Sequence, residues 1–172
     1  MIANADKFHA IVLNRKGDQT DIPFNINGEI IKSEKDVILL GLTIDNRLSL
    51  SKHINQLCKS AANQLNSIKR LKRHLTRETK SCMAKTFVMS QFNYCPLVWH
   101  FCMPGDTHKM EKIQERALRF IYNDYTSDYS KLLEENGETT LYLKRVRIIA
   151  HEVYKAINGI SPKYMKELLK TR

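Results

Sequence analysis

The sequence predicts an α+β fold that is mainly α-helical, with a short antiparallel β-hairpin segment at the N-terminus followed by an all-α helical domain. Apolar residues recur with a period near two up to Asp45 and near 3.6 beyond it, as is typical of strands and then helices. Gly (6) and Pro (4) are scarce, which argues against an all-β fold with many tight turns. We therefore expect two domains, at residues 1–46 and 47–172.

The predicted strands are short. Residues 8–13 form one strand-like run, and two more apolar segments flank Asn27-Gly28, a dipeptide typical of hairpin turns. A near-continuous apolar run at residues 37–44 is closed by Asp45-Asn46. Three or four strands, which we expect to be antiparallel, fit residues 8–45. Such a hairpin set is marginally stable by itself and must pack on something.

Two helices are predicted next. Ser49 or Ser51 can cap the first, and Thr76 starts the second, which Pro96 should kink or end. Seven residues of the first helix form one apolar stripe: Ile54, Leu57, Cys58, Ala61, Leu65, Ile68 and Leu71.

The remaining helices have similar signals. Pro104-Gly105 is expected to be a loop, after which Asp106 or Thr107 caps a helix with Met110, Ile113, Ala117, Phe120 and Ile121 on one face. A long helix opens at Thr139-Thr140, and we expect its inward side chains to be Val146, Ile149, Ala150, Val153, Tyr154 and Ile157. Asn158-Gly159 stops that helix and Ser161-Pro162 starts another.

The chain is strongly basic, with 28 Lys and Arg against 18 Asp and Glu and a net charge of +10. This charge suits a polyanionic partner, although a solubilised helical surface would account for it as well. No window approaches the 18 uncharged apolar residues of a membrane span, and no signal peptide is visible. Four Cys without such a signal indicate reduced thiols, so we expect the nucleus or cytoplasm, no secretion and no membrane.

Most of the charge lies in one segment. Residues 51–80 contain eight Lys or Arg and one acid, a net charge of +7. Dipole compensation is confined to the last turn of a helix, so it does not explain a cluster this dense. We favour contact with a nucleic-acid backbone over a solvated face. The candidate residues are Lys69, Arg70, Lys72, Arg73 and Arg77.

Two further basic faces are predicted. One comprises Lys109, Lys112, Arg116 and Arg119, which share a helix side because they are three or four residues apart. The other comprises Lys144, Arg145 and Arg147. Such groups would hold phosphates and position a duplex without reading bases.

The segment at residues 93–108 is both apolar and rich in metal-capable side chains. Cys95, His100, Cys102 and His108 could bind zinc, but their spacing matches no zinc-finger or knuckle pattern, so we favour core thiols and expect no metal. Leu97, Val98 and Trp99 are expected to be buried. Phe101, Phe120 and Ile121 are the expected neighbours of Trp99.

Two segments of the chain are distinctive. The first is Asn93-Tyr94-Cys95-Pro96-Leu97-Val98-Trp99-His100-Phe101-Cys102. The second is Lys112-Ile113-Gln114-Glu115-Arg116-Ala117-Leu118-Arg119-Phe120-Ile121-Tyr122. Together they closely resemble the region C-terminal to the polymerase palm in reverse transcriptases of non-LTR (LINE-type, jockey/CR1-like) retrotransposons. The resemblance extends over nearly the whole chain, and these two segments are its most specific matches.

The resemblance implies roles for other residues. Residues 1–8 are similar to the family motif N-x-x-K, whose Lys, here Lys7, is thought to help protonate the pyrophosphate leaving group. Residues 37–45 resemble the primer-grip hairpin, with Leu39, Leu40, Gly41 and Leu42 at its centre. His53-Ile54-Asn55 and the helices beyond resemble the thumb, which closes over the template–primer duplex.

The chain departs from the family at the catalytic centre. The family needs an upstream Asp and a [YF]-x-D-D hairpin to hold Mg²⁺, and no Asp-Asp pair occurs here. We therefore expect a fragment, covering the end of the palm and the thumb-like region, that is inactive alone, binds no cofactor, and keeps non-specific affinity for RNA or DNA duplex. The alternative is a domesticated basic α-helical binding or scaffold module with no polymerase role. The sequence does not indicate an oligomeric state.

Overall fold

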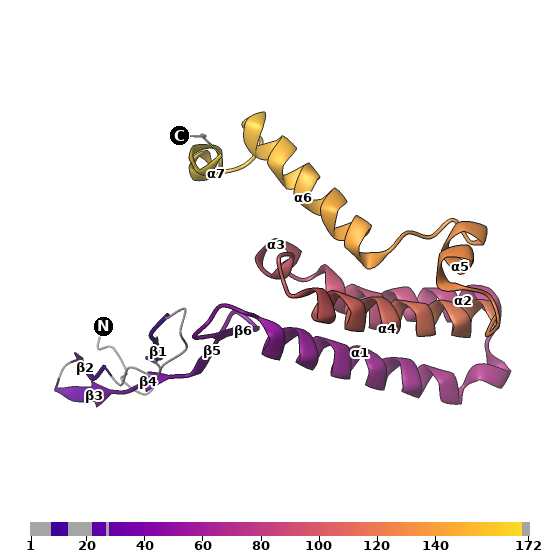
Figure 1. The fold of residues 1–172 in the computed structure, drawn as a ribbon, viewed down its shortest axis with the longest axis horizontal. Helices are drawn as coiled ribbons and strands as arrows, with labels where there is room; N and C mark the ends of the chain where they lie inside the picture. Colours follow the sequence, from indigo (N-terminus) through magenta and orange to yellow (C-terminus); the bar gives the residue numbers. More distant parts are fainter. Residues whose placement is uncertain (1–7, 14–21, 27, 170–172) are drawn as a thin grey trace. The chain divides into compact units, whose positions relative to one another are not determined.

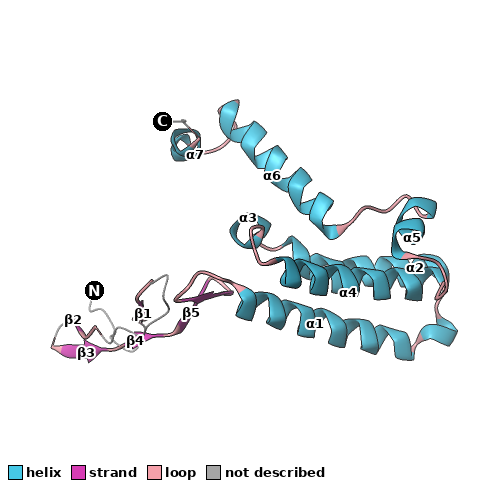
Figure 2. Ribbon diagram, in the orientation of Figure 1, coloured by secondary structure: helices cyan, strands magenta, loops and turns pink. Residues whose placement is uncertain are grey.

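The computed structural model describes residues 8–13, 22–26 and 28–169. It confirms an α+β fold that is mainly α-helical, with the strands at the N-terminal end (Figures 1 and 2). The chain divides into two compact units, at residues 1–56 and 57–172. The division lies inside helix α1 (Ser51–Arg70) and not at residue 46, because the first turns of α1 bond to the last strand.

Among its described residues, the N-terminal unit holds six short strands in three pairs. β2 (Phe24–Ile26) and β3 (Glu29–Ile31) are antiparallel, as the Asn-Gly turn signal predicts, although Asn27 itself lies outside the described residues. β1 (Ala10–Ile11) pairs with β4 (Ser33–Glu34) in parallel, so the expectation of antiparallel strands throughout was wrong.

The apolar run at residues 37–44 is itself a hairpin. β5 (Asp36–Leu39) and β6 (Leu42–Asp45) are antiparallel, with Leu39 opposite Leu42. The two turn residues, Leu40 and Gly41, both have positive φ, as a two-residue type I′ turn requires. The next pair along the hairpin joins Ile38 to Thr43.

Asp45 links this hairpin to α1. Its carboxylate accepts hydrogen bonds from the backbone N–H groups of Arg47 (3.1 Å), Ser49 (3.1 Å) and Leu50 (2.7 Å). These bonds outweigh the effect of burial and hold the pKa of Asp45 below its ordinary value. In the same unit Thr43 donates to Gln56 (2.8 Å).

The predicted apolar stripe of α1 is largely confirmed, because Ile54, Ala61, Leu65 and Ile68 are buried. Leu71 follows the helix and is exposed. The chain then turns through η2 (Lys72–His74) into α2 (Arg77–Met83), whose predicted cap, Thr76, accepts from the N–H of Thr79 (3.2 Å).

The second predicted helix is continuous but irregular. α2 passes into a π-helical turn, η3 (Ala84–Val88), and a 3₁₀ segment, η4 (Met89–Asn93). Pro96 begins the short helix α3 (Pro96–Trp99) after Cys95, which has a left-handed backbone. The helix therefore ends before Pro96, as expected, because a proline can occupy only the first turn of a helix.

Helix α4 (Pro104–Tyr122) begins earlier than predicted. Pro104 occupies its first turn and does not form a loop. The N–H groups of a first turn have no partner within the helix, so a proline, which has no N–H, loses no hydrogen bond at this position. Its predicted inward residues Met110, Ile113, Ala117, Phe120 and Ile121 are all buried. α4 packs against α2, α5 (Tyr129–Glu135) and α6 (Leu141–Ile157).

Helix α6 has the predicted limits but not the predicted inward face. Thr140 caps it through the N–H of Leu143 (3.2 Å), and Gly159 follows its end with positive φ. The buried residues are Leu141, Arg145 and Ala156, whereas Val146, Tyr154 and Ile157 are exposed. The apolar periodicity therefore predicted the wrong buried side for this helix.

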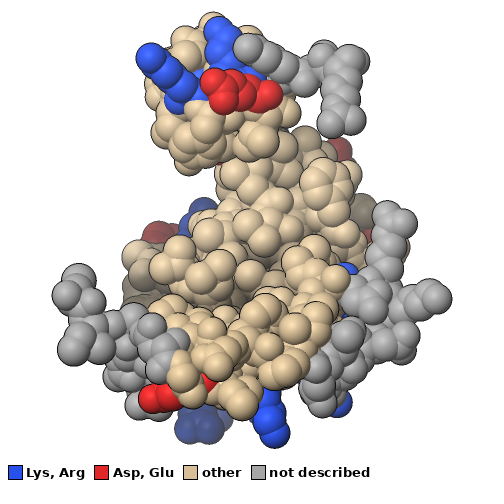
Figure 3. All heavy atoms as spheres, turned by 90° about the vertical axis from the view of Figure 1, so that its left-hand side faces the viewer, with Lys and Arg blue, Asp and Glu red and all other residues tan. Residues whose placement is uncertain are grey.

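The last helix, α7 (Lys163–Leu168), contacts α6. It begins after Pro162, close to the predicted restart of the chain. Figure 3 shows the basic side chains of α7 next to an acidic one, at the top of the view.

Candidate nucleic-acid interface

The basic segment predicted from the sequence lies where α1 ends and α2 begins (Figure 1). The N–H of Leu71 donates to Ile68 O (3.0 Å) and that of His74 to Leu71 O (2.9 Å), so the chain reverses in two tight turns. Arg70, Arg73 and Arg77 are exposed, and Lys69 and Lys72 are half-buried.

Aromatic rings from the end of α4 and the residues after it support these cations. The Arg77 guanidinium lies 4.4 Å from the ring centre of Tyr122. Lys72 Nζ lies 5.1 Å from the ring centre of Tyr125 and donates to its hydroxyl (3.3 Å). Cation–π contacts hold a cation in place without neutralising it. No local sequence pattern indicates these pairs, because residues 72 and 125 are far apart along the chain.

Arg116 of α4 joins the same cluster. Its Nη2 donates to Asn66 Oδ1 of α1 (3.3 Å). The pKa of Lys69 is lowered from its ordinary value by burial and also by repulsion from Arg116 and Lys72. Lys72 and Arg116 are therefore close enough to disfavour the charged form of Lys69. We call the set Lys69, Arg70, Lys72, Arg73, Arg77 and Arg116 the basic corner.

Within the described part of the chain, no carboxylate forms an ion pair with a residue of the basic corner. Glu78, the acid of this segment, lies in the first turn of α2. Its own backbone N–H, Thr76 and then Arg77 lower its pKa. Glu78 therefore offsets part of the charge of Arg77, and among the described residues the other five members of the basic corner present uncompensated positive charge, which is the property that attracts phosphates.

The other predicted α4 cations are neutralised locally. Lys112 Nζ lies 2.8 Å from a Glu115 oxygen, and Arg119 Nη2 lies 2.7 Å from the other. Hydrogen bonds from Lys112 and Arg119 lower the pKa of Glu115, against the opposing effect of burial. Lys109 pairs with Asp106 (2.8 Å). Of this predicted face, only Arg116 adds to the basic corner.

The third predicted basic face does not form. Lys144 pairs with Glu138 (3.0 Å), and Arg145 is 2% exposed. The Arg145 guanidinium lies 5.2 Å from the ring centre of Trp99, and burial lowers its pKa. A buried guanidinium cannot reach a duplex, so the prediction that Arg145 holds phosphates was wrong.

The hairpin that resembles a primer grip exposes its tip. Leu39 and Leu40 are exposed and Leu42 is buried. Leu40 adopts positive φ (48°), a conformation that leucine rarely takes and that stores backbone strain. Lys7, which the resemblance also marks, lies outside the described residues.

The predictions for the segment at residues 93–108 are confirmed only in part. Trp99 is buried, as predicted, and its Nε1 donates to Tyr94 O (2.8 Å). Leu97 and Val98 are exposed, so their predicted burial was wrong, because this stretch makes only one helical turn. Phe101, the expected neighbour of Trp99, is 89% exposed. The described residues contain no group of three or more His, Cys, Asp or Glu side chains arranged to hold a metal ion.

No helix among the described residues has the length and apolar character to cross a membrane. Comparison of the chain with models of protein families, with curated proteins and with solved structures found no match.

Proposed function

We propose that this chain is the end of the palm and the thumb-like region of a non-LTR retrotransposon reverse transcriptase, and that by itself it binds nucleic-acid duplex without sequence preference. The resemblance of residues 93–102 and 112–122 supports the family. The uncompensated charge of the basic corner supports the binding. A nucleic-acid partner would require the nucleus or cytoplasm.

The binding mechanism follows from the charges of the basic corner. Lys72 and Arg116 repel Lys69 in the free protein. Phosphate oxygens placed among them would remove that repulsion and release counterions from the duplex. Lys and Arg side chains on phosphates fix position but carry no sequence information, so binding is non-specific.

The hairpin tip separates the polymerase reading from the alternative of a basic scaffold module. In a polymerase fragment the exposed Leu39 and Leu40 would hold the primer end. Substituting them would then weaken binding to a recessed primer–template more than to a blunt duplex. A scaffold module gives no reason for such a difference.

A matched pair of single substitutions on α4 tests the proposal. Arg116 and Lys112 lie on the same helix and are both exposed, but only Lys112 is paired with a carboxylate. Arg116→Gln should weaken binding to an RNA–DNA hybrid in low salt by at least several-fold, whereas Lys112→Gln should change it little. Fluorescence anisotropy measures both. Equal effects of the two substitutions would remove the special role of the basic corner.

A further inference from the structure

An open groove of about 200 Å³ lies between the end of α1 and the junction of α2 with η3. Two large apolar side chains of this groove are open to solvent, since Leu71 is 47% exposed and Phe87 is 49% exposed. None of the lining residues carries a charge. They are Gln64, Ser67, Ile68, Leu71, Met83 and Phe87.

The groove adjoins the basic corner. Leu71 lies in the chain directly between Arg70 and Lys72, two cations of that cluster. Its backbone is held in the turn, because its N–H donates to Ile68 O (3.0 Å) and its carbonyl accepts from the N–H of His74 (2.9 Å). An apolar groove beside cations fits a partner that carries a flat apolar group next to a negative charge.

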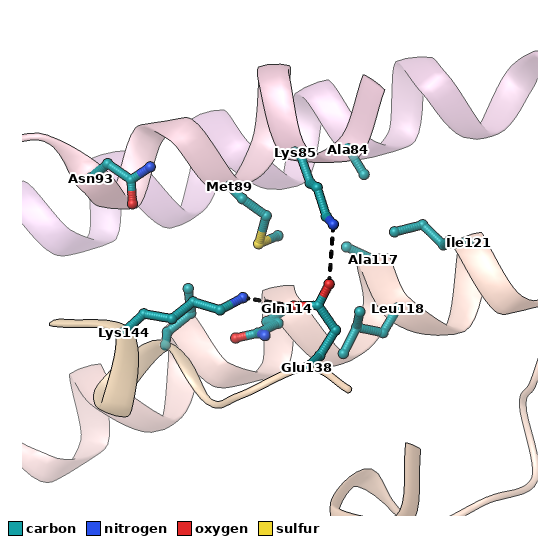
Figure 4. A pocket seen from close by; sticks show the side chains of 11 residues that line it. Ala84, Lys85, Met89, Asn93, Gln114, Ala117, Leu118, Ile121, Glu138 and Lys144 are labelled. Carbon is teal, nitrogen blue, oxygen red and sulfur yellow. Dashed lines mark hydrogen bonds and ion pairs between the residues drawn. The ribbon is translucent and has the colours of Figure 1, made fainter. Parts of the chain in front are cut away.

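The helical turn that carries Phe87 is anchored to the rest of the helical unit. Lys85 Nζ forms an ion pair with Glu138 (3.3 Å), as Figure 4 shows, and Val88 is fully buried. Gln91 Nε2 donates to Phe87 O (3.0 Å). The turn itself, η3, is π-helical, a feature that is frequent at functional sites. Phe87 is therefore an accessible ring on a fixed backbone.

The polar lining suits the edge of a ring whose face lies on Phe87. The Gln64 amide and the Ser67 hydroxyl are both exposed. Ser67 Oγ donates its hydrogen to Asn63 O (3.1 Å) and still can accept, whereas an amide offers both donors and an acceptor. An apolar cavity of roughly 150 Å³ holds benzene in another protein, so this groove has room for one planar heterocycle.

We propose that this groove holds one unpaired nucleobase, stacked on Phe87, from a strand whose phosphates lie on the basic corner. The inference rests on the proposed function and specifies its partner. Bases inside a duplex are stacked on one another, so only a base in a single-stranded extension is free to stack on Phe87. Every base has a flat face, so the contact does not select a sequence.

Two duplexes of equal charge isolate the base. One carries a single-stranded extension of three thymidines, and the other carries the same extension with abasic residues. In fluorescence anisotropy at low salt the protein should bind the thymidine extension at least about fivefold more tightly, the lower end of what one stacked base contributes. Equal binding of both duplexes would overturn this inference and leave the duplex binding intact. Binding of neither would overturn both proposals.

A matched pair of substitutions assigns the stacking to Phe87. Phe87→Ala should remove the preference for thymidine and leave the affinity for the abasic duplex unchanged. Phe101→Ala is the control, because Phe101 is more exposed than Phe87 but does not line this groove. If Phe87→Ala does not fold in a thermal melt, Phe87→Leu removes the flat ring and keeps most of the apolar volume. A preference that survives in the folded Phe87 variant would overturn the assignment.

Discussion

Trp99 and Phe101 are two residues apart and have opposite environments. Trp99 is fully buried with its N–H bonded to Tyr94 O, whereas Phe101 is almost fully exposed. Trp99→Ala should lower the free energy of unfolding by about 3–5 kcal/mol, as for other large-to-small core substitutions. Phe101→Ala is the matched control and should change it by less than about 0.5 kcal/mol.

Urea denaturation of both variants, together with a titration of duplex, checks this prediction. If Trp99 were instead a base-stacking platform, Trp99→Ala would cost about 1–3 kcal/mol in binding and leave the stability unchanged. That pattern would contradict the burial of Trp99.

Arg145 shows what the sequence could not reveal at the scale of one residue. Lys144, Arg145 and Arg147 are close together in the sequence and read as one basic face. In the structure Arg145 is buried between Trp99 and Met110, and its Nε and Nη2 have no partner among the described residues. Whether a cation faces solvent depends on the crossing of α6 over α3 and α4, which no local pattern contains.

At the scale of elements, local chemistry predicted most helix limits. Thr76 and Thr140 cap α2 and α6 as expected, since a side-chain oxygen before a helix satisfies an unused N–H. Pro104 was read as part of a loop because proline has two frequent positions, in a turn and at the start of a helix. The inward face of α6 was missed because part of its apolar face, at Val146, Tyr154 and Ile157, is exposed, so the apolar periodicity marks a side of the helix that is not the buried one.

The sequence predicted part of the basic corner, and the rest depends on how the helices pack. Lys69, Arg70, Lys72, Arg73 and Arg77 are adjacent in the sequence, so their clustering needed no tertiary information. The membership of Arg116, the neutralisation of Lys112 and Arg119, and the support from Tyr122 depend on how α4 packs and on which neighbours are acidic.

The turn after α4 carries a pH-dependent contribution to stability. Asp124 Oδ1 accepts from the N–H of Ser127 (3.0 Å) and of Thr126 (3.0 Å), and these bonds lower the pKa of Asp124 far below its ordinary value. The folded state therefore binds this proton less well than the unfolded state. The stability that the Asp124 carboxylate contributes is complete above its pKa in the unfolded chain, about 3.9. It is lost as the pH falls toward the lower pKa of Asp124 in the folded protein.

Asp124→Asn should accordingly destabilise the protein at neutral pH, with a deficit that shrinks as pH falls below about 4. Urea denaturation of the wild type and the variant at a series of pH values measures the difference. A deficit of constant size down to about pH 2 would show that the Asp124 turn has no such role.

At the scale of the whole molecule, the 172-residue chain holds no Asp-Asp pair. Phosphoryl transfer by the reverse transcriptases that this chain resembles depends on two metal ions held by carboxylates. We predict that the purified chain does not extend a primer on an RNA template in the presence of dNTPs and Mg²⁺. Extension above a buffer control that persists after removal of contaminating polymerases would refute this prediction.

The salt dependence of binding shows whether the basic corner supplies the contacts to nucleic acid. Two variants with the same loss of charge are compared with the wild type. One replaces Lys69, Arg70, Lys72 and Arg73 with Gln. The other replaces Lys109, Lys112, Lys131 and Lys155, each of which is already paired with a carboxylate.

The dissociation constant for a duplex is measured at several salt concentrations, where the wild type should fall near 10⁻⁴–10⁻⁶ M at physiological salt. The slope of log K against log salt should flatten by about three units in the first variant, at roughly 0.9 per lost phosphate contact. It should change by less than about one unit in the second. Equal slopes for the two variants would show that net charge, and not the basic corner, determines binding.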